Sequence, residues 1–360
     1  MIRSKTDVMT LGNHEFDRGP AFLDSCISAC PFPVLCANVR RKADGAPVPG
    51  TKPWVLLERC GIRIGVLGLT TEYTPYMVEK SAFAPFEMTS AAEAAARHIP
   101  AMRAAGADVV VVLTHMPFYQ AADGTLTGEL PELIDAVCEI EGVHWVRILY
   151  CYPDRVTDKL IDTIARQPKA VHYFDIPVQH ASAHVLRDMN RRGDRETITA
   201  LCQKIREKIP DVVLRTTLIA GFPTESEEDF AELCKLVEEV RFDRLGCFAY
   251  SQEEDTPAAE LEQIPEEVRR RRAEIIMELQ MSAAFDFADR CTGRTLEVLA
   301  EGWEDGQYYG RSYMDAPDID TRVYFTSEDE IEPGSYVPVL ITDTDGYDLI
   351  GMAKAKEDTK

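Results

Sequence analysis

The chain has 360 residues, enough for two or three domains with hydrophobic cores. Residues 1–125 hold 12 Lys/Arg and 12 Asp/Glu, whereas residues 126–360 hold 27 Lys/Arg and 49 Asp/Glu and so carry the whole net charge of −22. This negative charge argues against nucleic acid as the main partner of the second part and favours a basic partner. The ten cysteines have no paired spacing and no apolar run is long enough to span a membrane, so we expect a cytoplasmic protein without disulfides.

The first 117 residues alternate between short apolar strands and polar segments. A helix is expected over residues 90–105, and strands are expected over residues 8–11, 33–37, 55–57, 62–69 and 107–113. The polar segment G-N-H-E-F-D (residues 12–17) follows the first of these strands, and T-H (residues 114–115) follows the last. Polar residues at strand ends are typical of metal sites in α/β folds.

These residues resemble the calcineurin-like metallophosphoesterases, especially the 5′-nucleotidase branch, over almost all of residues 1–117. The resemblance implies that Asn13 and His115 are divalent-metal ligands and that His14 stabilises the phosphoryl transition state. The family uses two bridged metal ions, which together need about six to eight ligands. The D-x-H, G-D and G-H-x-H segments of the family are missing from this sequence. We therefore expect an incomplete metallophosphoesterase α/β sandwich, in which these residues are leftovers at strand ends.

Residues 130–290 show repeated β-α units, after a junction at residues 118–129 that has no periodicity. Strands are expected over 145–151, 171–176, 212–220 and 243–250, and helices over 130–140, 157–166, 184–191 and 195–208. A further helix follows, which Thr224 is expected to cap with Glu227 completing a capping box. A polar loop that contains proline follows each strand, and in β/α barrels this edge holds the chemistry.

The motifs L-Y-C-Y-P-D-R-V, D-I-P-V-Q-H-A-S, L-R-D-M-N-R-R-G and R-T-T-L-I-A-G-F-P resemble the RimO-type methylthiotransferases, over about residues 128–353. These radical-SAM enzymes place a methylthio group on an aspartate of a small-subunit ribosomal protein, using [4Fe–4S] clusters and S-adenosylmethionine (SAM). The resemblance implies a partial radical-SAM barrel. It places seven residues on the SAM side: Gln179, His180, Ser182, Arg215, Gly221, Phe222 and Pro223. His180 is equally well explained as a satisfied polar residue at a strand end.

The family holds its catalytic cluster on a C-x3-C-x2-C loop, and none of the ten cysteines has this spacing. Cys26 and Cys30 begin such a pattern, but its third position is Pro33. We therefore expect no iron–sulfur ligands in this sequence, buried packing roles for the other cysteines, and a polypeptide that is inactive alone.

Residues 265–353 are expected to form a helix that Pro265 begins, followed by a small barrel. Strands at 295–300, 308–313, 322–325, 337–342 and 347–352 predict an OB-like barrel and resemble the TRAM domain. Residues 293–353 hold three Arg, no Lys and 14 Asp/Glu, so a basic small-subunit ribosomal protein suits them better than nucleic acid. The run Arg269 to Arg272 is interpreted as a solvated helix face.

The sequence thus predicts an α/β protein with four parts: a metallophosphoesterase-like fragment (1–117), a junction (118–129), a partial radical-SAM barrel with its linking helix (130–290) and a TRAM domain (293–353). The first hypothesis for its function is aspartate methylthiolation of a ribosomal protein. The alternatives are a metal-dependent phosphoesterase of the 5′-nucleotidase type and a non-catalytic binder of a basic ribosomal protein. A natural fusion and an artefact of gene assembly both fit the change of resemblance at the junction.

Overall fold

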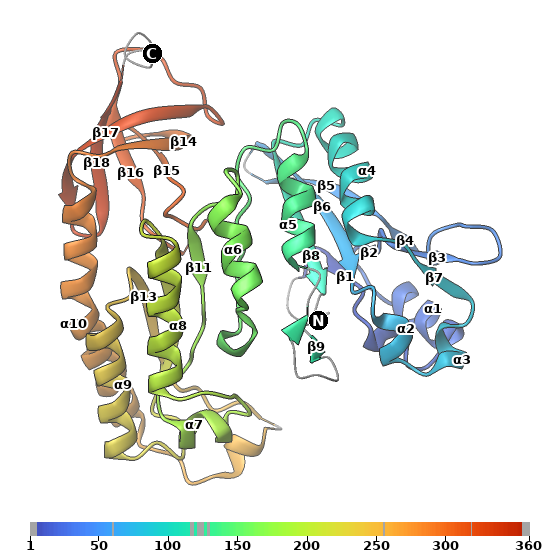
Figure 1. The fold of residues 1–360 in the computed structure, drawn as a ribbon, viewed down its shortest axis with the longest axis horizontal. Helices are drawn as coiled ribbons and strands as arrows, with labels where there is room; N and C mark the ends of the chain where they lie inside the picture. The colour runs from blue at the N-terminus through green and yellow to red at the C-terminus, as the bar shows by residue number, and fades with distance from the viewer. Residues whose placement is uncertain are drawn as a thin grey trace. The chain divides into compact units, whose positions relative to one another are not determined.

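The computed structural model describes residues 6–59, 61–115, 119–120, 126–127, 130–254, 256–317 and 319–354. The chain divides into two compact units, the first made of residues 1–146 and 166–170 and the second of residues 147–165 and 171–360 (Figure 1). Most of the expected junction, residues 118–129, lies outside the described residues. Among the described residues, no helix is both long enough and apolar enough to cross a membrane.

The first unit is built around β6 (Ile62–Thr70), which pairs antiparallel with β5 (Trp54–Arg59) and parallel with β8 (Val109–His115). The predicted strands at 62–69 and 107–113 are confirmed as β6 and β8. Five of the shorter strands form a three-stranded parallel sheet and a two-stranded antiparallel sheet, and β9 (Tyr119–Gln120) pairs antiparallel with β10 (Leu126–Thr127). Their bounds are β1 (Met9–Thr10), β2 (Val34–Leu35) and β4 (Thr51–Lys52) for the first, and β3 (Val39–Arg41) and β7 (Phe86–Met88) for the second.

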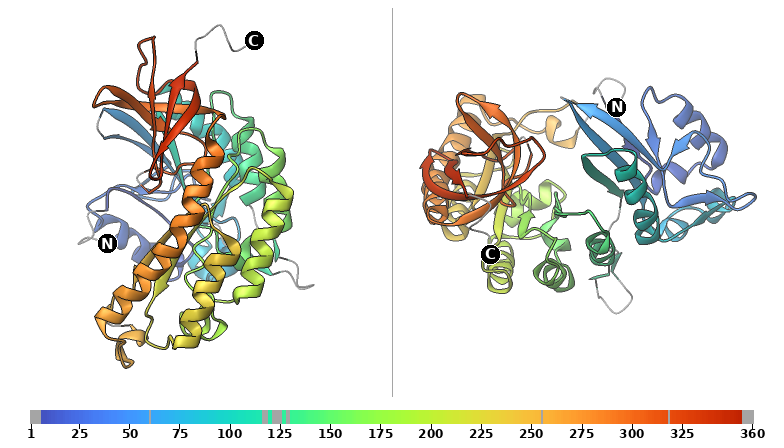
Figure 2. Two further views of the ribbon diagram at one scale, coloured as in Figure 1. Left: turned by 90° about the vertical axis from the view of Figure 1, so that its left-hand side faces the viewer. Right: turned by 90° about the horizontal axis from the view of Figure 1, so that it is seen from above.

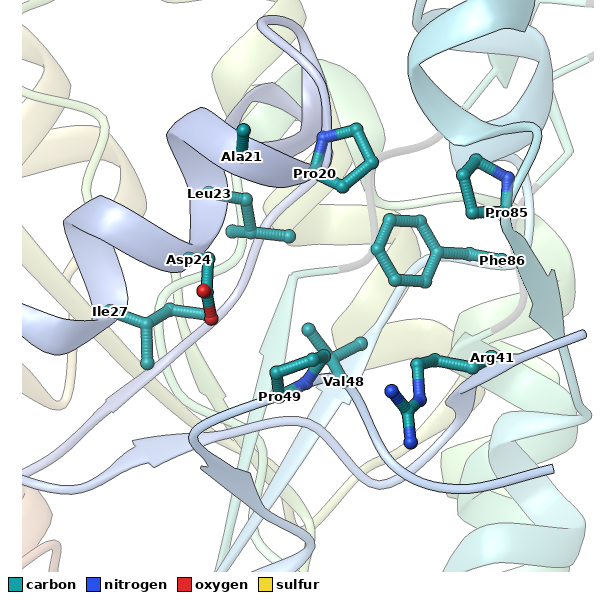
Figure 3. A pocket seen from close by; sticks show the side chains of 10 residues that line it. All are labelled: Pro20, Ala21, Leu23, Asp24, Ile27, Arg41, Val48, Pro49, Pro85 and Phe86. Carbon is teal, nitrogen blue, oxygen red and sulfur yellow. The ribbon is translucent and has the colours of Figure 1, made fainter. Parts of the chain in front are cut away.

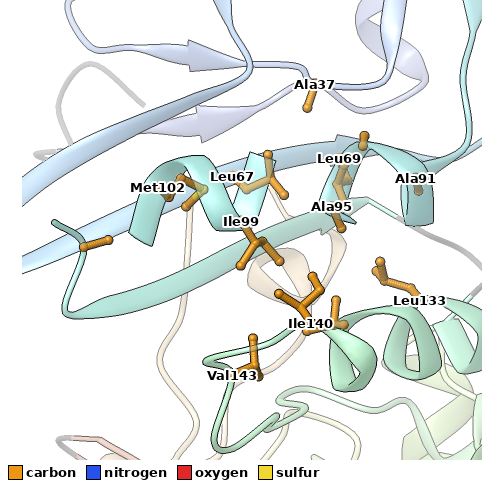
Figure 4. Close-up of a cluster of buried hydrophobic side chains, with 13 residues drawn as sticks. Ala37, Leu67, Leu69, Ala91, Ala95, Ile99, Met102, Leu133, Ile140 and Val143 are labelled. Carbon is orange, nitrogen blue, oxygen red and sulfur yellow. The ribbon is translucent and has the colours of Figure 1, made fainter. Parts of the chain in front are cut away.

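Two helices, α4 (Ala91–Ala104) and α5 (Leu130–Glu139), cover β6 and close a core in this unit. Ser90 caps α4 by accepting a hydrogen bond from Glu93 N (3.4 Å). Leu67 and Leu69 of β6 pack with Ile99 and Leu133 from the two helices (Figure 4). Burial of this apolar surface is the main stabilising contribution to the unit. The remaining helices are α1 (Pro20–Ser28), α2 (Thr74–Met77) and α3 (Lys80–Phe83).

The second unit contains a parallel sheet in the order β11 (Tyr173–Asp175), β12 (Val213–Ala220) and β13 (Arg244–Ala249). Helices α8 (Arg195–Lys208), α9 (Glu227–Val240) and α10 (Glu266–Cys291) lie side by side along it (Figure 1). Two shorter helices, α6 (Asp158–Arg166) and α7 (Ala183–Asp188), belong to the connections. The predicted β-α repeat is therefore present for these three strands.

The strand predicted at 145–151 is not formed as a continuous strand. Val146 makes an isolated parallel bridge with Ala170, and Cys151 N donates to Asp175 O at 2.7 Å. Between these contacts Tyr150 has a φ of +69°, which is incompatible with an extended strand. The backbone hydrogen bonds to the neighbouring segment therefore occur at the two ends, near Val146 and Cys151, and no continuous strand ladder forms between them.

The cap of α9 also differs from the prediction. Ser226, not Thr224, is the N-cap, and it forms a capping box with Asp229. Glu225 N donates to Phe222 O at 2.8 Å, so residues 222–225 form a turn of their own. The helix therefore begins two residues beyond the predicted cap.

The C-terminal barrel is closed in the order β14 (Thr295–Glu304), β15 (Gln307–Arg311), β16 (Val323–Thr326), β18 (Asp348–Ala353) and β17 (Tyr336–Asp345). Figure 2 shows it as a ring of strands at the end of α10. Val298, Phe325 and Val339 are fully buried inside it. The predicted small closed barrel is confirmed. Pro265 caps α10 from outside the helix instead of being its first residue.

Candidate functional site

The loops after β11 and β12 meet at one edge of the sheet, because parallel strands end on the same side. Gln179 bridges directly to β12: its N–H donates to Thr217 O (2.9 Å) and its carbonyl accepts from Ile219 N (2.8 Å). These bonds hold Gln179 at a φ of +69°. The loop with Gln179, His180 and Ser182 and the turn at residues 221–223, both of which the resemblance places on the SAM side, therefore follow neighbouring strands at this edge.

His180 and Glu225 form a fully buried pair between these two loops. His180 Nε2 donates to Glu225 Oε2 at 3.0 Å, and His180 Nδ1 accepts from Ser182 N at 3.0 Å. Glu225 Oε2 also accepts from Gly221 N at 2.9 Å. Because an amide can only donate to Nδ1, the ring carries its proton on Nε2, and both nitrogens are already engaged. His180 connects the loops and has no free nitrogen for a ligand.

Arg272 of α10 completes this cluster. Its Nη1 contacts Glu225 Oε1 and its Nη2 contacts Glu227 Oε1, both at 2.6 Å. Burial lowers the pKa of Arg272, but the two carboxylates outweigh this and hold the pKa above its usual value. The interpretation of Arg272 as a solvated residue is wrong, since only 6% of it is exposed. Its spacing of four residues from buried Ile276 was the signal that could have found it.

The other arginines of that run behave differently. Arg270 pairs with Glu266, and Arg271 lies within 3.2 Å of Glu274 and 3.0 Å of Glu278. Both are exposed, so for them the solvated helix face is confirmed. Arg269 is partly buried and donates through Nη1 to Tyr250 O at 2.7 Å.

Ser182 caps α7 and binds Asp229 of α9. Its Oγ donates to Asp229 Oδ1 and accepts from His184 N (3.2 Å). Burial raises the pKa of the Asp229 carboxyl, but hydrogen bonds from Ser182, Ser226 and His184 bring it well below its usual range. Ser182 is thus a positioning residue between two helices.

Arg215 points along the sheet to two carboxylates. Its Nη1 lies 2.7 Å from Asp175 Oδ1, and its Nε lies 3.6 Å from Asp320 Oδ1 in the loop between β15 and β16. Tyr173 Oη donates to Asp320 Oδ2 at 2.6 Å. Burial raises the pKa of Asp320, although the Tyr173 hydrogen bond opposes the rise. In this arrangement Arg215 joins the sheet to the barrel.

The turn Gly221–Phe222–Pro223 is held by α10. Gly221 has a φ of +78°, and a Cβ there would lie 2.4 Å from Arg269 Cγ, so this position requires glycine. Phe222 packs edge-on against Tyr250, with ring centroids 5.3 Å apart. The predicted turn is therefore a close contact between sheet and helix.

Gln179 carries a side-chain acceptor atom that no described residue satisfies. Its side chain is buried, and Oε1 has no hydrogen-bond partner among the described residues. A buried amide oxygen without a partner costs free energy unless a ligand or water supplies a donor. Of the seven residues predicted for the SAM side, Gln179 is therefore the one with an unsatisfied buried atom that a ligand could contact.

The nine cysteines within the described residues do not fit a [4Fe–4S] cluster. Burial raises the pKa of Cys151, Cys202 and Cys247 to about 12, which disfavours the thiolate that binds iron. Within the described part of the chain, no group of three or more His, Cys, Asp or Glu residues has the arrangement of a metal site. No catalytic step through a cluster can therefore be derived from these residues.

In the first unit, the predicted metal ligands are brought together. Asn13 Oδ1 and His115 Nε2 lie 2.7 Å apart across 102 residues of sequence, at the ends of β1 and β8. Asn13 is buried, and its Nδ2 has no partner among the described residues. His14 is mostly exposed and lies 2.9 Å from Asp17 through Nδ1. Two donors cannot hold a metal pair, so this donor set does not fit the phosphoesterase centre.

A pocket of about 280 Å³ lies elsewhere in the same unit (Figure 3). Leu23, Val48 and Phe86 form apolar walls, and Asp24 and Arg41 supply charged groups. Asn13, His14 and His115 do not line it, so it is separate from the predicted metal ligands.

Comparison with protein families gives two matches. Residues 87–237 match the model of the radical SAM superfamily, and residues 292–353 match the model of the TRAM domain. The chain contains a radical SAM region and a C-terminal TRAM domain. The first match begins within the segment that resembles phosphoesterases, so the two similarities overlap over residues 87–117.

Individual relatives agree with this. The chain is 47% identical over 228 residues to the ribosomal protein uS12 methylthiotransferase RimO of Lachnoclostridium phytofermentans, covering 62% of this chain and 52% of the relative. It is 45% identical over 261 residues to the protein of the same name from Desulfitobacterium hafniense, covering 72% and 59%. The chain thus spans between half and three fifths of the length of these relatives.

Solved structures resemble the chain less closely. The 5′-nucleotidase precursor of Thermus thermophilus has 30% identity over 32% of this chain and 22% of that chain, with a TM-score of 0.29. The radical SAM enzyme HemN of Escherichia coli has 21% identity over 56% of this chain and 48% of that chain, with a TM-score of 0.36. Both scores are too low to support an argument about function.

Proposed function

We propose that residues 128–353 derive from a RimO-type methylthiotransferase whose substrate is an aspartate of the small-subunit ribosomal protein uS12. The observation that carries this proposal is sequence identity of 45–47% that extends over more than 220 residues. The joined loops at Gln179 and Gly221 and the acidic TRAM domain support it. A protein with this substrate works in the cytoplasm.

When bound, SAM and a [4Fe–4S] cluster supply the radical that such enzymes use. In this chain Gln179 Oε1 would accept a hydrogen bond from an amino group of SAM. The turn from Gly221 to Pro223 would lie beside it at the same edge of the parallel sheet. Arg215, His180 and Ser182 would hold the loops in place through their present partners. Because the cysteines that the structure describes do not fit a cluster, we propose that this polypeptide alone does not perform the reaction.

Anaerobic reconstitution with iron and sulfide tests this proposal. We expect iron and sulfide far below one cluster per chain, whereas the Lachnoclostridium phytofermentans relative treated in parallel should bind clusters stoichiometrically. A stoichiometric cluster in this chain would contradict the proposed inactivity. Methylthiolation of uS12 by the reconstituted chain, followed by mass spectrometry, would then decide its activity directly.

A metal-dependent phosphoesterase is the second candidate, because the fold brings together Asn13 and His115, the two residues that the resemblance assigns to the metal site. Manganese-dependent hydrolysis of bis-p-nitrophenyl phosphate would support it if His14→Ala abolished the rate and Glu93→Ala did not. No manganese-dependent hydrolysis above the buffer rate would reject it.

A non-catalytic binder of basic protein through the TRAM domain is the third candidate. The net charge of −11 over residues 293–353 favours it. It differs from the first candidate because it needs neither SAM nor a cluster.

A further inference from the structure

One side of the TRAM domain presents an exposed indole on a rigid base. Trp303 at the end of β14 is 58% exposed, and its ring packs edge-on against Tyr308, with centroids 5.1 Å apart. Tyr308 in turn stacks on buried Phe325, with centroids 5.6 Å apart. The indole is therefore anchored through Tyr308 to the barrel core, yet most of it faces solvent.

An acidic loop is fixed beside this indole. The loop joins β16 to β17, and Ile331 N donates to Tyr308 Oη at 3.2 Å. Glu330 and Glu332 flank Ile331 in sequence, and both are exposed. Together with Trp303 and Tyr308, these two glutamates define the Trp303 surface.

The carboxylates of this loop are free to bind a cation. Glu330 and Glu332, like Glu328 and Asp329 before them, form no ion pair within the described part of the chain. By contrast, Glu304 on β14 of the same barrel is paired with Arg322 at 2.9 Å. The loop therefore holds uncompensated negative charge next to an exposed aromatic face.

We propose that the Trp303 surface binds an arginine-rich segment of a basic protein. An indole attracts a guanidinium over its face, and arginine is favoured over lysine because its planar group also stacks. The neighbouring carboxylates would add charge-assisted hydrogen bonds to the same guanidinium groups. They would repel the phosphates of a nucleic acid. This inference rests on the proposed binding of a basic protein by the TRAM domain and assigns that binding to a defined surface.

Binding of an Arg-Gly repeat peptide to the full chain tests the proposal. Isothermal titration should detect binding that weakens with salt, and a peptide with citrulline at every arginine should not bind. Trp303→Ala should weaken binding about fivefold, as expected for one cation–π contact. The double variant Glu330→Gln/Glu332→Gln should weaken it about tenfold.

The matched control is Glu254→Gln/Glu262→Gln, which removes the same charge from an exposed loop before α10 and should change affinity less than about twofold. Equal losses in the test and control pairs, or unchanged binding by Trp303→Ala in a folded protein, would overturn the proposal. Preference for a single-stranded RNA over the peptide would also overturn it. Because the titration needs neither SAM nor a cluster, failure of methylthiolation leaves its outcome unaffected.

Discussion

At the scale of single residues, Glu225 is the group on which the sheet edge depends most. It accepts hydrogen bonds from His180 and Gly221 and pairs with Arg272, and its side chain is fully buried. A buried carboxylate is stabilised only while its partners remain, and its removal leaves Arg272 with the exposed Glu227 alone. The loops after β11 and β12 therefore share one charged centre.

We expect Glu225→Gln to lower the free energy of unfolding by about 3 kcal/mol, because an amide cannot replace the charge that Arg272 faces. Urea unfolding followed by circular dichroism measures this change. Glu228→Gln, an exposed change in the first turn of α9, should stay within about 0.5 kcal/mol. Equal effects of the two changes would show that the buried cluster contributes little.

Asp229 predicts a pH dependence. Its folded pKa is depressed, so its stabilising contribution is present above the usual aspartate pKa of about 4 and is lost as pH falls below that value. The free energy of unfolding of the Asp229→Asn variant should therefore fall furthest below that of the native chain at neutral pH. The difference should shrink as the pH is lowered below about 4. Unfolding curves of both proteins across this range would contradict the prediction if the difference stayed constant.

At the scale of elements, the loop between β15 and β16 joins the barrel to the sheet. Asp315 pairs with Arg244 of β13 at 2.9 Å, and both side chains are almost fully buried. Asp320 reaches Tyr173 and Arg215 on the neighbouring strands. The barrel thus neutralises arginines whose charge the sheet would otherwise bury without a partner.

Asp315→Ala should destabilise the chain by about 3 kcal/mol, because it leaves the Arg244 guanidinium buried and unpaired. Thermal unfolding with matched urea titrations provides the measurement. Asp329→Ala, in the exposed loop of the same barrel, is the control and should have little effect. If Asp315→Ala matched this control, the barrel and the sheet would be energetically independent.

At the scale of the whole molecule, the negative charge of residues 126–360 favours binding of positively charged partners. A net charge of −22 attracts polycations over a distance that salt shortens to about 10 Å at 0.1 M. The first 125 residues carry equal numbers of positive and negative groups and contribute nothing to this attraction.

We expect fluorescently labelled poly-lysine to bind the chain at low salt and to dissociate as salt is raised. A labelled single-stranded RNA should show no binding under the same conditions, since its phosphates are repelled. Fluorescence anisotropy measures both. RNA binding with a steep salt dependence would instead reveal a basic surface hidden by the overall charge.

Local periodicity in the sequence determined much of the fold. The predicted helix at 195–208 coincides with α8 (Arg195–Lys208), and the central strand at 212–220 corresponds to β12 (Val213–Ala220). The five-stranded barrel follows from short alternating strands and turn residues. Such patterns arise from residues close together in the sequence, so they can be recognised from a single sequence.

Only the tertiary structure decided which polar groups are partners. Arg272 and Glu225 are 47 residues apart, and Asn13 and His115 are 102 apart, so no local pattern reveals that each pair is in contact. Residues 145–151 have the composition of a strand, but they lack a continuous partner and form none. Hydrogen bonding between strands and pairing of buried charges are long-range interactions, and only the assembled fold satisfies them.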